Sequence, residues 1–160
     1  MTTDKQRFRE LMGRFVTGVT VIATQADDGV AAMTANAVTA VSLDPLLLLV
    51  CIRNESSLLR KLLQHGAFSV NVLAAGQDDI SRHYGARAKG MSPARWITAE
   101  TGVPRLAGAN AVFVCRVSVS HVVGDHTVIY GAVDAMEAAE PVAPALIYAG
   151  GKYADLCLAA

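Results

Sequence analysis

The sequence has no surplus of either charge and little charge altogether. Lys and Arg number 14 in total, Asp and Glu also number 14, and charged residues make up only 18% of the chain. No block of Lys or Arg occurs. Proteins whose main partner is nucleic acid neutralise its phosphates with clustered basic residues. We therefore expect no nucleic acid among the partners of this chain.

Long hydrophobic runs are also missing, although 52% of the residues are apolar. A membrane-spanning helix needs roughly 18 consecutive apolar residues or more, and the longest run here, residues 46–52, is far shorter. Its length and uninterrupted apolar character fit a strand that is covered on both faces. We expect no membrane span. The apolar surplus instead predicts a homo-oligomeric interface, because obligate interfaces resemble a protein core.

Signals for secretion and for metal binding are absent as well. The N-terminal segment lacks an apolar signal core, which favours a cytoplasmic location. The three cysteines, Cys51, Cys115 and Cys157, have no CxxC spacing and leave an odd number. A disulfide framework or a zinc site is therefore not expected. His121 and His126 flank a turn without a carboxylate pattern around them, so we predict no metal site.

Several motifs for nucleotide binding and hydrolysis are missing. No GxGxxG follows a strand, which argues against the usual dinucleotide-binding fold. Residues 85–90 have the GxxxxG spacing, but Met91 stands where a P-loop needs Lys. There is no GxSxG nucleophile elbow and no HExxH zinc motif. These absences exclude the commonest nucleotide folds and two large classes of hydrolase.

What the sequence does contain is a series of short strands and a few helices, in one domain spanning residues 1–160. Periodicity and turn residues predict helices over residues 4–16, 56–64 and 77–84, and strands over residues 19–25, 30–36, 37–43, 46–52, 67–73, 111–122, 126–136 and 145–148. Residues 85–108 show no sustained period and are predicted to be irregular. We expect a mainly β protein, a closed or nearly closed antiparallel barrel with flanking helices.

Two of the predicted helices carry an apolar stripe. The stripes consist of Phe8, Leu11, Met12 and Phe15 in the first helix, and of Leu58, Leu59, Leu62 and Leu63 in the second. This spacing places the apolar side chains on one helical face. We expect both faces to be buried.

Residues 31–57 hold the best candidate for a ligand site. The side chains of residues 33–37 are mostly small and include a hydroxyl and an amide, so a flat ligand can approach the backbone closely. Later in the stretch, Arg53 and the hydroxyls of Ser56 and Ser57 stand at a predicted helix start. The first N–H groups of a helix are free donors at its positive end and suit a phosphate. The pattern predicts a cradle for a planar ring at one end and a phosphate at the other.

Five short motifs together resemble one known family. They are Phe15-Val16-Thr17-Gly18-Val19-Thr20-Val21, Met33-Thr34-Ala35-Asn36-Ala37, Val41-Ser42-Leu43-Asp44-Pro45, Phe68-Ser69-Val70-Asn71-Val72-Leu73 and Gly124-Asp125-His126. Over nearly its whole length the chain resembles the flavin reductase-like family, whose FMN-binding split barrel is an antiparallel, Greek-key-like barrel. More narrowly, it resembles the reductase components of two-component flavin-dependent monooxygenases. The family often has Pro-Pro where this chain has Pro45-Leu46, and Phe-Ala where it has Tyr84-Gly85.

The resemblance implies an enzyme, an NAD(P)H:flavin oxidoreductase. Such a protein is a homodimer that binds FMN or FAD, takes hydride from NADH or NADPH, and hands the reduced flavin to a partner monooxygenase. Both flavins and both pyridine nucleotides stay open at this stage. The alternative is a non-catalytic flavin- or haem-binding split barrel that acts as a sensor or carrier. A pyridoxamine phosphate oxidase-like activity on the same architecture is a third hypothesis.

The resemblance also implies roles for individual residues. His126 is expected to be the catalytic residue, because it would set the nicotinamide at hydride distance from the flavin. The residues expected to bind cofactor are Met33, Thr34, Ala35, Asn36, Ala37, Thr39 and Ser42 in the first part of the cradle, Cys51, Ile52, Arg53, Ser56 and Ser57 in the second, and Asn71, His83, Tyr84, Asp125, Tyr148, Lys152 and Tyr153 further along the chain.

Each group of these residues has a structural alternative. Thr34 and Asn36 would serve a strand-end turn. Ser56 would be an ordinary helix cap beside a solvated Arg. His126 would be a turn residue capped by Asp125. The C-terminal tail would be a strand that packs into the core.

Overall fold

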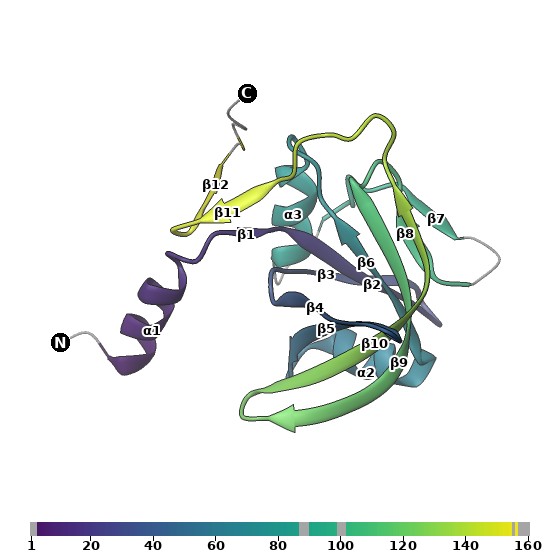
Figure 1. Cartoon of the computed structure of the whole chain (residues 1–160), viewed down its shortest axis with the longest axis horizontal. Helices are drawn as coiled ribbons and strands as arrows, with labels where there is room; N and C mark the ends of the chain where they lie inside the picture. Colours follow the sequence, from purple (N-terminus) through teal and green to yellow (C-terminus); the bar gives the residue numbers. More distant parts are fainter. Residues whose placement is uncertain (1–2, 87–89, 99–101, 155, 157–160) are drawn as a thin grey trace.

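The fold consists mainly of antiparallel strands with helices beside them (Figure 1). The computed structural model describes residues 3–86, 90–98, 102–154 and 156. Its helices are α1 (Asp4–Met12), α2 (Ser57–His65) and α3 (Asp78–Gly85). Its strands are β1 (Thr17–Gly18), β2 (Thr20–Ala26), β3 (Gly29–Ala35), β4 (Val38–Leu43), β5 (Leu46–Arg53), β6 (Ala67–Val72), β7 (Trp96–Thr98), β8 (Pro104–Leu106), β9 (Ala111–Val123), β10 (His126–Ala138), β11 (Ile147–Ala149) and β12 (Lys152–Ala154). The prediction of a mainly β protein with flanking helices is confirmed.

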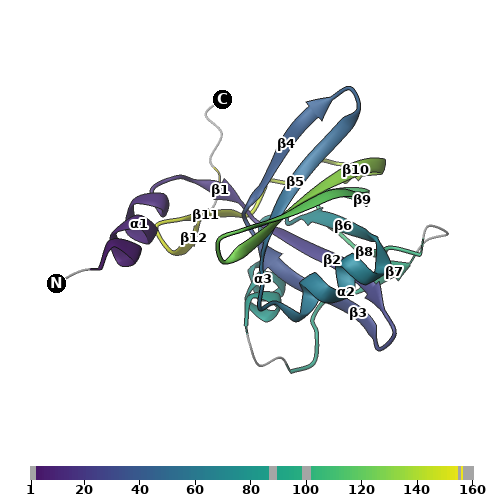
Figure 2. The ribbon, with the colours of Figure 1, turned by 90° about the horizontal axis from the view of Figure 1, so that it is seen from below.

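Seven strands form the central antiparallel sheet, in the order β3-β2-β6-β9-β10-β5-β4. The edge strands are β3 and β4, and within the described residues they do not pair with each other. Figure 2 shows the β4–β5 hairpin projecting away from the half of the sheet that contains β2 and β3. Of the predicted closed or nearly closed antiparallel barrel, the described residues therefore form the open, split version.

Two smaller sheets complete the architecture, one of β1, β11 and β12 and one of β7 and β8. Strands β7 and β8 lie within residues 85–108, so the prediction that this whole segment is irregular is wrong. Each of the two strands has only three residues, which is too short for an alternating pattern to appear. Residues 87–89 and 99–101 of this segment, like Cys157, lie outside the described residues.

Strand β2 separates two hydrophobic clusters. Successive side chains of a strand point to opposite faces. Val21 therefore packs into one cluster with Leu73, while Ile22 packs into the other with Phe68 and with Leu62 of α2. All five side chains are fully buried. This double burial fixes β2 as a support for the neighbouring edge strand β3.

The limits of α2 follow from its capping residues. Ser56 precedes the helix, and its Oγ accepts a hydrogen bond from the N–H of Leu58 at 3.3 Å. Gly66 ends the helix with φ 78°, a left-handed conformation that Gly adopts without strain, and its N–H donates to the carbonyl of Leu62 at 2.9 Å. Three of the four Leu residues in the predicted stripe are buried, but Leu63 is 41% exposed.

Helix α1 has its predicted apolar stripe, but none of its residues is buried. Phe8 is 67% exposed and Phe15, just beyond the helix, is 70% exposed. Figures 1 and 2 both show α1 extending away from the rest of the chain. The helix ends at Met12, earlier than predicted, and Gly13 caps it. None of the helices in the described residues has the length and apolar character needed to cross a membrane.

Candidate functional site

Two adjoining hollows lie at the end of β3. The β3 hollow, about 420 Å³ in volume, is bordered by Thr34 and Asn36, by Ser81 of α3 and by Tyr148 of β11. The α1 hollow, about 620 Å³ in volume, shares Asn36 and Tyr148 with it and extends to His126 and to the apolar side of α1. The shared residues make the two hollows one continuous surface.

A third hollow lies at the start of α2. This α2 hollow, about 290 Å³ in volume, is lined by residues of β3, by Ser57 and Lys61 of α2, and by His83 and Tyr84 of α3. Ser57 is the first residue of α2, so the positive end of the helix lies at this hollow, where Ser56 Oγ already accepts from the N–H of Leu58. Lys61, one helical turn further on, adds a positive charge. The α2 hollow therefore suits a phosphate.

A direct contact joins β3 to the start of α2. The hydroxyl of Ser56 lies 3.6 Å from the sulfur of Met33. Thr34 and Ala35 are half-buried, whereas Asn36 and Ala37 are exposed. The segment that the sequence predicted as a ring cradle is thus an open shelf beside the predicted phosphate site, and not a buried strand end.

The shelf offers backbone groups to a ligand because β3 is an edge strand. Such a strand directs alternate N–H and C=O groups away from its neighbour. The shelf is held at two points: Thr34 Oγ1 donates to the carbonyl of Ser81 at 2.7 Å, and the backbone carbonyl of Ala35 accepts from Thr20 Oγ1 of β2 at 2.6 Å. A flat ring with donors and acceptors along its edge can bind such a fixed row of dipoles.

The C-terminal strands form one wall of the β3 hollow. Tyr148 and Tyr153 pack edge to face with ring centroids 5.4 Å apart. The hydroxyl of Tyr153 is 2.8 Å from Ser81 Oγ, and the guanidinium of Arg82 lies 4.7 Å from the centre of its ring. Both tyrosines line the hollow, whereas Lys152 is exposed and lines none of the three hollows. The tail therefore brings two of its three predicted residues to the site.

His126 faces the α1 hollow from the start of β10. Its Nδ1 lies 2.8 Å from Asp125 Oδ1, and the His126 hydrogen bond is the main cause that lowers the pKa of the Asp125 carboxyl. His126 therefore makes the expected contact with Asp125 and also lies beside a hollow. Because Asp125 holds Nδ1, Nε2 is the ring nitrogen that can meet a ligand.

Asn54, which the sequence reasoning missed, fastens this turn. Its backbone N–H donates to the carbonyl of Asp125 at 3.0 Å, and its Nδ2 donates to the carbonyl of Gly124 at 3.1 Å. Its Oδ1 accepts from Thr127 Oγ1 at 2.8 Å. Asn54 therefore fixes the position of His126 relative to the end of β5. Only its place between Arg53 and the predicted helix start marked it in the sequence.

Tyr84 is buried and does not offer its ring face freely. Its hydroxyl accepts from Trp96 Nε1 at 2.9 Å and lies 2.6 Å from Ser92 Oγ. The Tyr84 and Trp96 rings meet edge to face at 5.7 Å, and the ring of His83 lies 4.7 Å from that of Tyr84. Tyr84 and His83 both line the α2 hollow. The segment after α3, predicted to be irregular, thus supports one wall of the site.

Asn71 does not belong to the site, and this prediction is corrected. The residue is fully buried. Its Nδ2 donates to the carbonyl of Val21 at 2.9 Å and to Ser69 Oγ at 2.8 Å, and its Oδ1 accepts from the N–H of Leu106 at 2.8 Å. A buried amide is stable only when its groups are paired. Asn71 therefore ties β6 to β2 and β8.

Six other predicted residues line none of the three hollows: Met33, Ser56 and Asp125, whose contacts are described above, and Ile52, Ser42 and Arg53. Ile52 points into the core and is fully buried. Ser42 accepts a hydrogen bond from the N–H of Asp44 at 3.2 Å and lies on a separate apolar groove beside β4. Arg53 is exposed at the end of β5, opposite His126 in the strand register. Side chains alternate between the two faces of a strand, which explains why Ile52 points into the core. The length of β5 separates Ser42 from the shelf.

Thr39 and Cys51 do line the α1 hollow, as does Ala37. Burial raises the pKa of the Cys51 thiol. The protonated thiol is a poor nucleophile, so Cys51 acts here as a small apolar residue. Among the described residues, no group of three or more His, Cys, Asp and Glu side chains is arranged to hold a metal ion.

Comparisons with known proteins agree with this geometry. The family described as "Flavin reductase like domain" matches residues 12–156. The chain is 38% identical over 156 residues to "FMN reductase (NADH) RutF 1" of Methylorubrum extorquens, covering 96% of this chain and 77% of that protein. It is 34% identical over 155 residues to "Flavin-dependent monooxygenase, reductase subunit HsaB" of Mycobacterium tuberculosis, covering 96% of this chain and 83% of that protein.

A solved structure shows the same fold. The NADH:FAD oxidoreductase SgcE6 of Streptomyces globisporus C-1027, in complex with NAD and FAD fragments, superposes with a TM-score of 0.90 at 31% identity. The match covers 96% of this chain and 93% of that one. The split-barrel prediction is therefore confirmed. Together with the shelf on β3 and the helix start beside it, these matches show that the chain belongs to the flavin reductase-like family.

Proposed function

We propose that this protein is an NADH-dependent flavin reductase whose flavin lies on the shelf formed by residues 33–37. The observation that carries the proposal is the continuity of the shelf with the start of α2. A planar ring is accommodated at the edge of β3, and a phosphate at Ser57 and Lys61. The relatives named as NADH-dependent reductases support NADH as the donor.

The residues of the site fit FMN or FAD. The fixed dipoles along β3 can stabilise negative charge on a ring that gains electrons. The N-terminus of α2 and Lys61 provide a positive end for the ribityl phosphate. A bound flavin supplies the ring that accepts a hydride from NADH. The protein's task is to hold that ring flat, with one face open to the second substrate.

His126 positions NADH in this proposal. Its Nε2 can hydrogen-bond the carboxamide of the nicotinamide, while Asp125 fixes the orientation of the imidazole. Hydride transfer between two rings depends strongly on their approach, so a positioning contact accelerates the reaction without moving a proton. Tyr148 and the apolar residues of α1 border the same space and help to exclude water.

Reduced flavin leaves the shelf for a partner oxygenase. The names of relatives support this step, because HsaB is the reductase subunit of a flavin-dependent monooxygenase and BorF is the flavin reductase component of a tryptophan halogenase. The open shelf, only partly covered by side chains of this chain, suits a flavin that is exchanged as a substrate.

A homodimer is the second part of the proposal, and α1 supports it. An apolar helix face that is exposed to water is unfavourable, and a second copy of the chain can cover it. The α1 hollow, which contains Phe8 and Phe15 as well as His126, would then lie close to the interface. Residues 1–160 as one domain and a cytoplasmic location remain predictions from the sequence.

One titration tests the proposal. Purified protein is titrated with FMN and with FAD, and NADH consumption is then measured with and without each flavin. We expect NADH to be consumed only when flavin is present. Flavin binding without NADH oxidation would favour the sensor or carrier hypothesis. Oxidation of pyridoxamine phosphate would favour the third hypothesis, and the absence of any flavin dependence would reject the reductase.

A further inference from the structure

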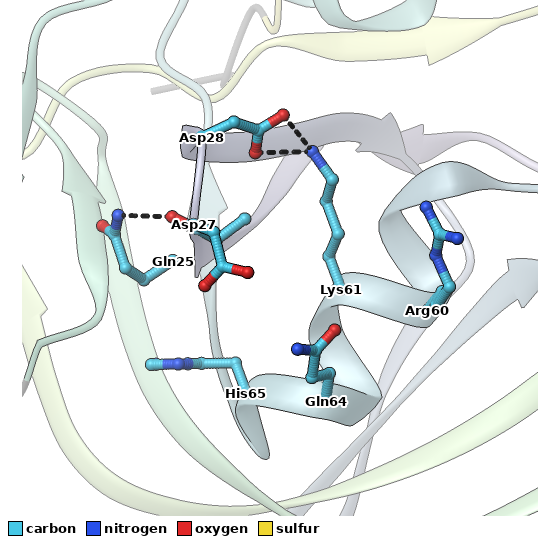
Figure 3. Close-up of a pocket in the computed structure, with 8 residues that line it drawn as sticks. Gln25, Asp27, Asp28, Arg60, Lys61, Gln64 and His65 are labelled. Atoms are coloured by element: carbon cyan, nitrogen blue, oxygen red, sulfur yellow. Dashed lines mark hydrogen bonds and ion pairs between the residues drawn. The ribbon is translucent and has the colours of Figure 1, made fainter.

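A polar cavity lies between the β2–β3 turn and α2, apart from every residue predicted to bind cofactor (Figure 3). We call it the hairpin cavity. Its volume is about 490 Å³, within the range of about 300–1,000 Å³ that is typical of small-molecule sites. Its lining includes Gln25, Asp27, Asp28, Lys61, Gln64 and His65. Polar side chains on both sides distinguish it from a packing defect in a hydrophobic core.

Lys61 joins this cavity to the α2 hollow, since it lines both. Its Nζ lies 2.7 and 2.8 Å from the two carboxylate oxygens of Asp28, which fastens the turn to the helix. An ammonium group has three donors, so Lys61 can keep this ion pair and still donate to a phosphate oxygen. A ligand that starts at the phosphate end of the shelf can therefore continue past Lys61 into the hairpin cavity.

The order of charges along this path matches a dinucleotide. The positive end of α2 and Lys61 come first and suit phosphates. Beyond them, the carboxylates of Asp27 and Asp28 offset the positive charges of Lys61 and of Arg60, which also lines the cavity, and they can accept hydrogen bonds from ribose hydroxyls. From Ser57 to Gln64 the path is about 10 Å along the helix. The cavity thus favours an uncharged, hydroxyl-rich group attached to a diphosphate.

The remaining side chains suit a purine base. Gln25 and Gln64 each carry an amide that can donate and accept, as the edge of adenine requires. Gln25 Nε2 donates to the carbonyl of Ala26 at 3.0 Å, which orients its side chain. In Figure 3, Gln64 and His65 extend from α2 towards the turn that carries Asp27. His65 adds a flat ring against which a base can stack.

We propose that the hairpin cavity binds the adenosine moiety of FAD, so that FAD binds more tightly than FMN. This inference rests on the proposed function, because it needs the flavin phosphate at the α2 hollow. FAD is favoured over NADH as the source of the adenosine. His126, which receives the nicotinamide, faces the α1 hollow on the other side of the shelf.

The test compares two flavins that differ only in the adenylate. Kd values for FMN and FAD are measured by flavin fluorescence for the wild type, for Asp27→Asn and for Gln64→Ala. We expect wild-type protein to bind FAD more tightly than FMN. Each substitution should raise the Kd for FAD by about fivefold to tenfold, the equivalent of one lost hydrogen bond. The Kd for FMN should stay within about twofold of the wild-type value, which also shows that the variant is folded.

Asp44→Asn is the matched control for Asp27→Asn. Both residues are exposed Asp side chains at hairpin turns, but Asp44 lies between β4 and β5, away from the cavity. It should change neither Kd. AMP provides a second readout, since it should compete with FAD for the wild-type protein and leave FMN binding unaffected.

The possible failures are distinct. If FMN and FAD bind equally and both substitutions leave both Kd values unchanged, the adenosine site is rejected while the reductase stands. If the substitutions raise the Kd for FMN and the Kd for FAD equally, the cavity has only a structural role beneath the shelf. If instead the KM for NADH rises with FMN as the acceptor and the Kd for FAD is unchanged, the cavity takes the adenosine of NADH. Failure to bind either flavin would reject the proposed function itself.

Discussion

The hydroxyl of Ser56 lies 3.6 Å from the sulfur of Met33, so the cap of α2 touches the first residue of the shelf on β3. The two residues are distant in sequence, and β4 and β5 lie between them. Their contact joins a flat surface with free backbone groups to a helix start that attracts anions. This juxtaposition is the physical basis of our proposal that the site binds a ring and its phosphate together.

Replacement of His126 by Ala should impair the use of NADH and spare the binding of flavin. Loss of one orienting hydrogen bond predicts a decrease of about tenfold in kcat/KM for NADH. Steady-state kinetics and a flavin titration on the same preparation measure the two effects. His121→Ala, on the same hairpin but outside the three hollows, is the control. Unchanged kinetics in His126→Ala would transfer the positioning role to Tyr148 and its neighbours.

A negative charge at Ser57 should weaken flavin binding. The carboxylate of Ser57→Asp lies at the first position of α2, where it favours the helix but repels a phosphate. We expect the Kd for FMN to rise by about tenfold or more, with no loss of thermal stability. Ser118→Asp on exposed β9 should have no effect on the Kd. Equal affinities for FMN and for riboflavin in the wild type would contradict a phosphate site here.

The apolar face of α1 predicts self-association. Phe8→Glu should shift the protein from dimer to monomer in sedimentation velocity, because a charge would then be buried in the interface. Met91→Glu is the control, since Met91 is also an exposed apolar residue but is remote from α1 in the sequence. A wild-type protein that sediments as a monomer at all accessible concentrations would rule out the dimer.

Gly131 is expected to tolerate no side chain. A Cβ added there would lie 2.7 Å from Phe68 Cζ and 2.9 Å from Cys115 Cβ, both of them core atoms. Gly131→Ala should therefore lower the free energy of unfolding by about 1–3 kcal/mol, measured by urea denaturation. Gly18→Ala, where a Cβ meets nothing within 4 Å, should leave it nearly unchanged. Equal stability of the two variants would show that the core relaxes around the added methyl group.

The sequence predicted the strands of the main sheet and the shelf because both depend on local signals. Alternating apolar residues predicted β9, for example, and the hydroxyls before α2 predicted its cap. The resemblance to the family then suggested a role for His126 in the Gly-Asp-His turn. These signals lie within a few residues of each other along the chain, so they can be read before the fold is known.

The errors arise where tertiary contacts decide. Asn71 looks like a ligand residue, but β6 is covered on both sides and its amide pairs inside the core. Strand β8 begins at Pro104 and is too short to show a period. Lys61 was not singled out in the sequence at all, yet the fold places it between two hollows. None of these positions can be read from neighbours in the sequence.

Rapid mixing of NADH with the flavin-loaded protein, without oxygen, is the most direct test of the central claim. The absorbance of the oxidised flavin should disappear within the time of a single turnover, and His126→Ala should slow this step while the flavin remains bound. A flavin that stays bound and oxidised in the presence of excess NADH would contradict the account.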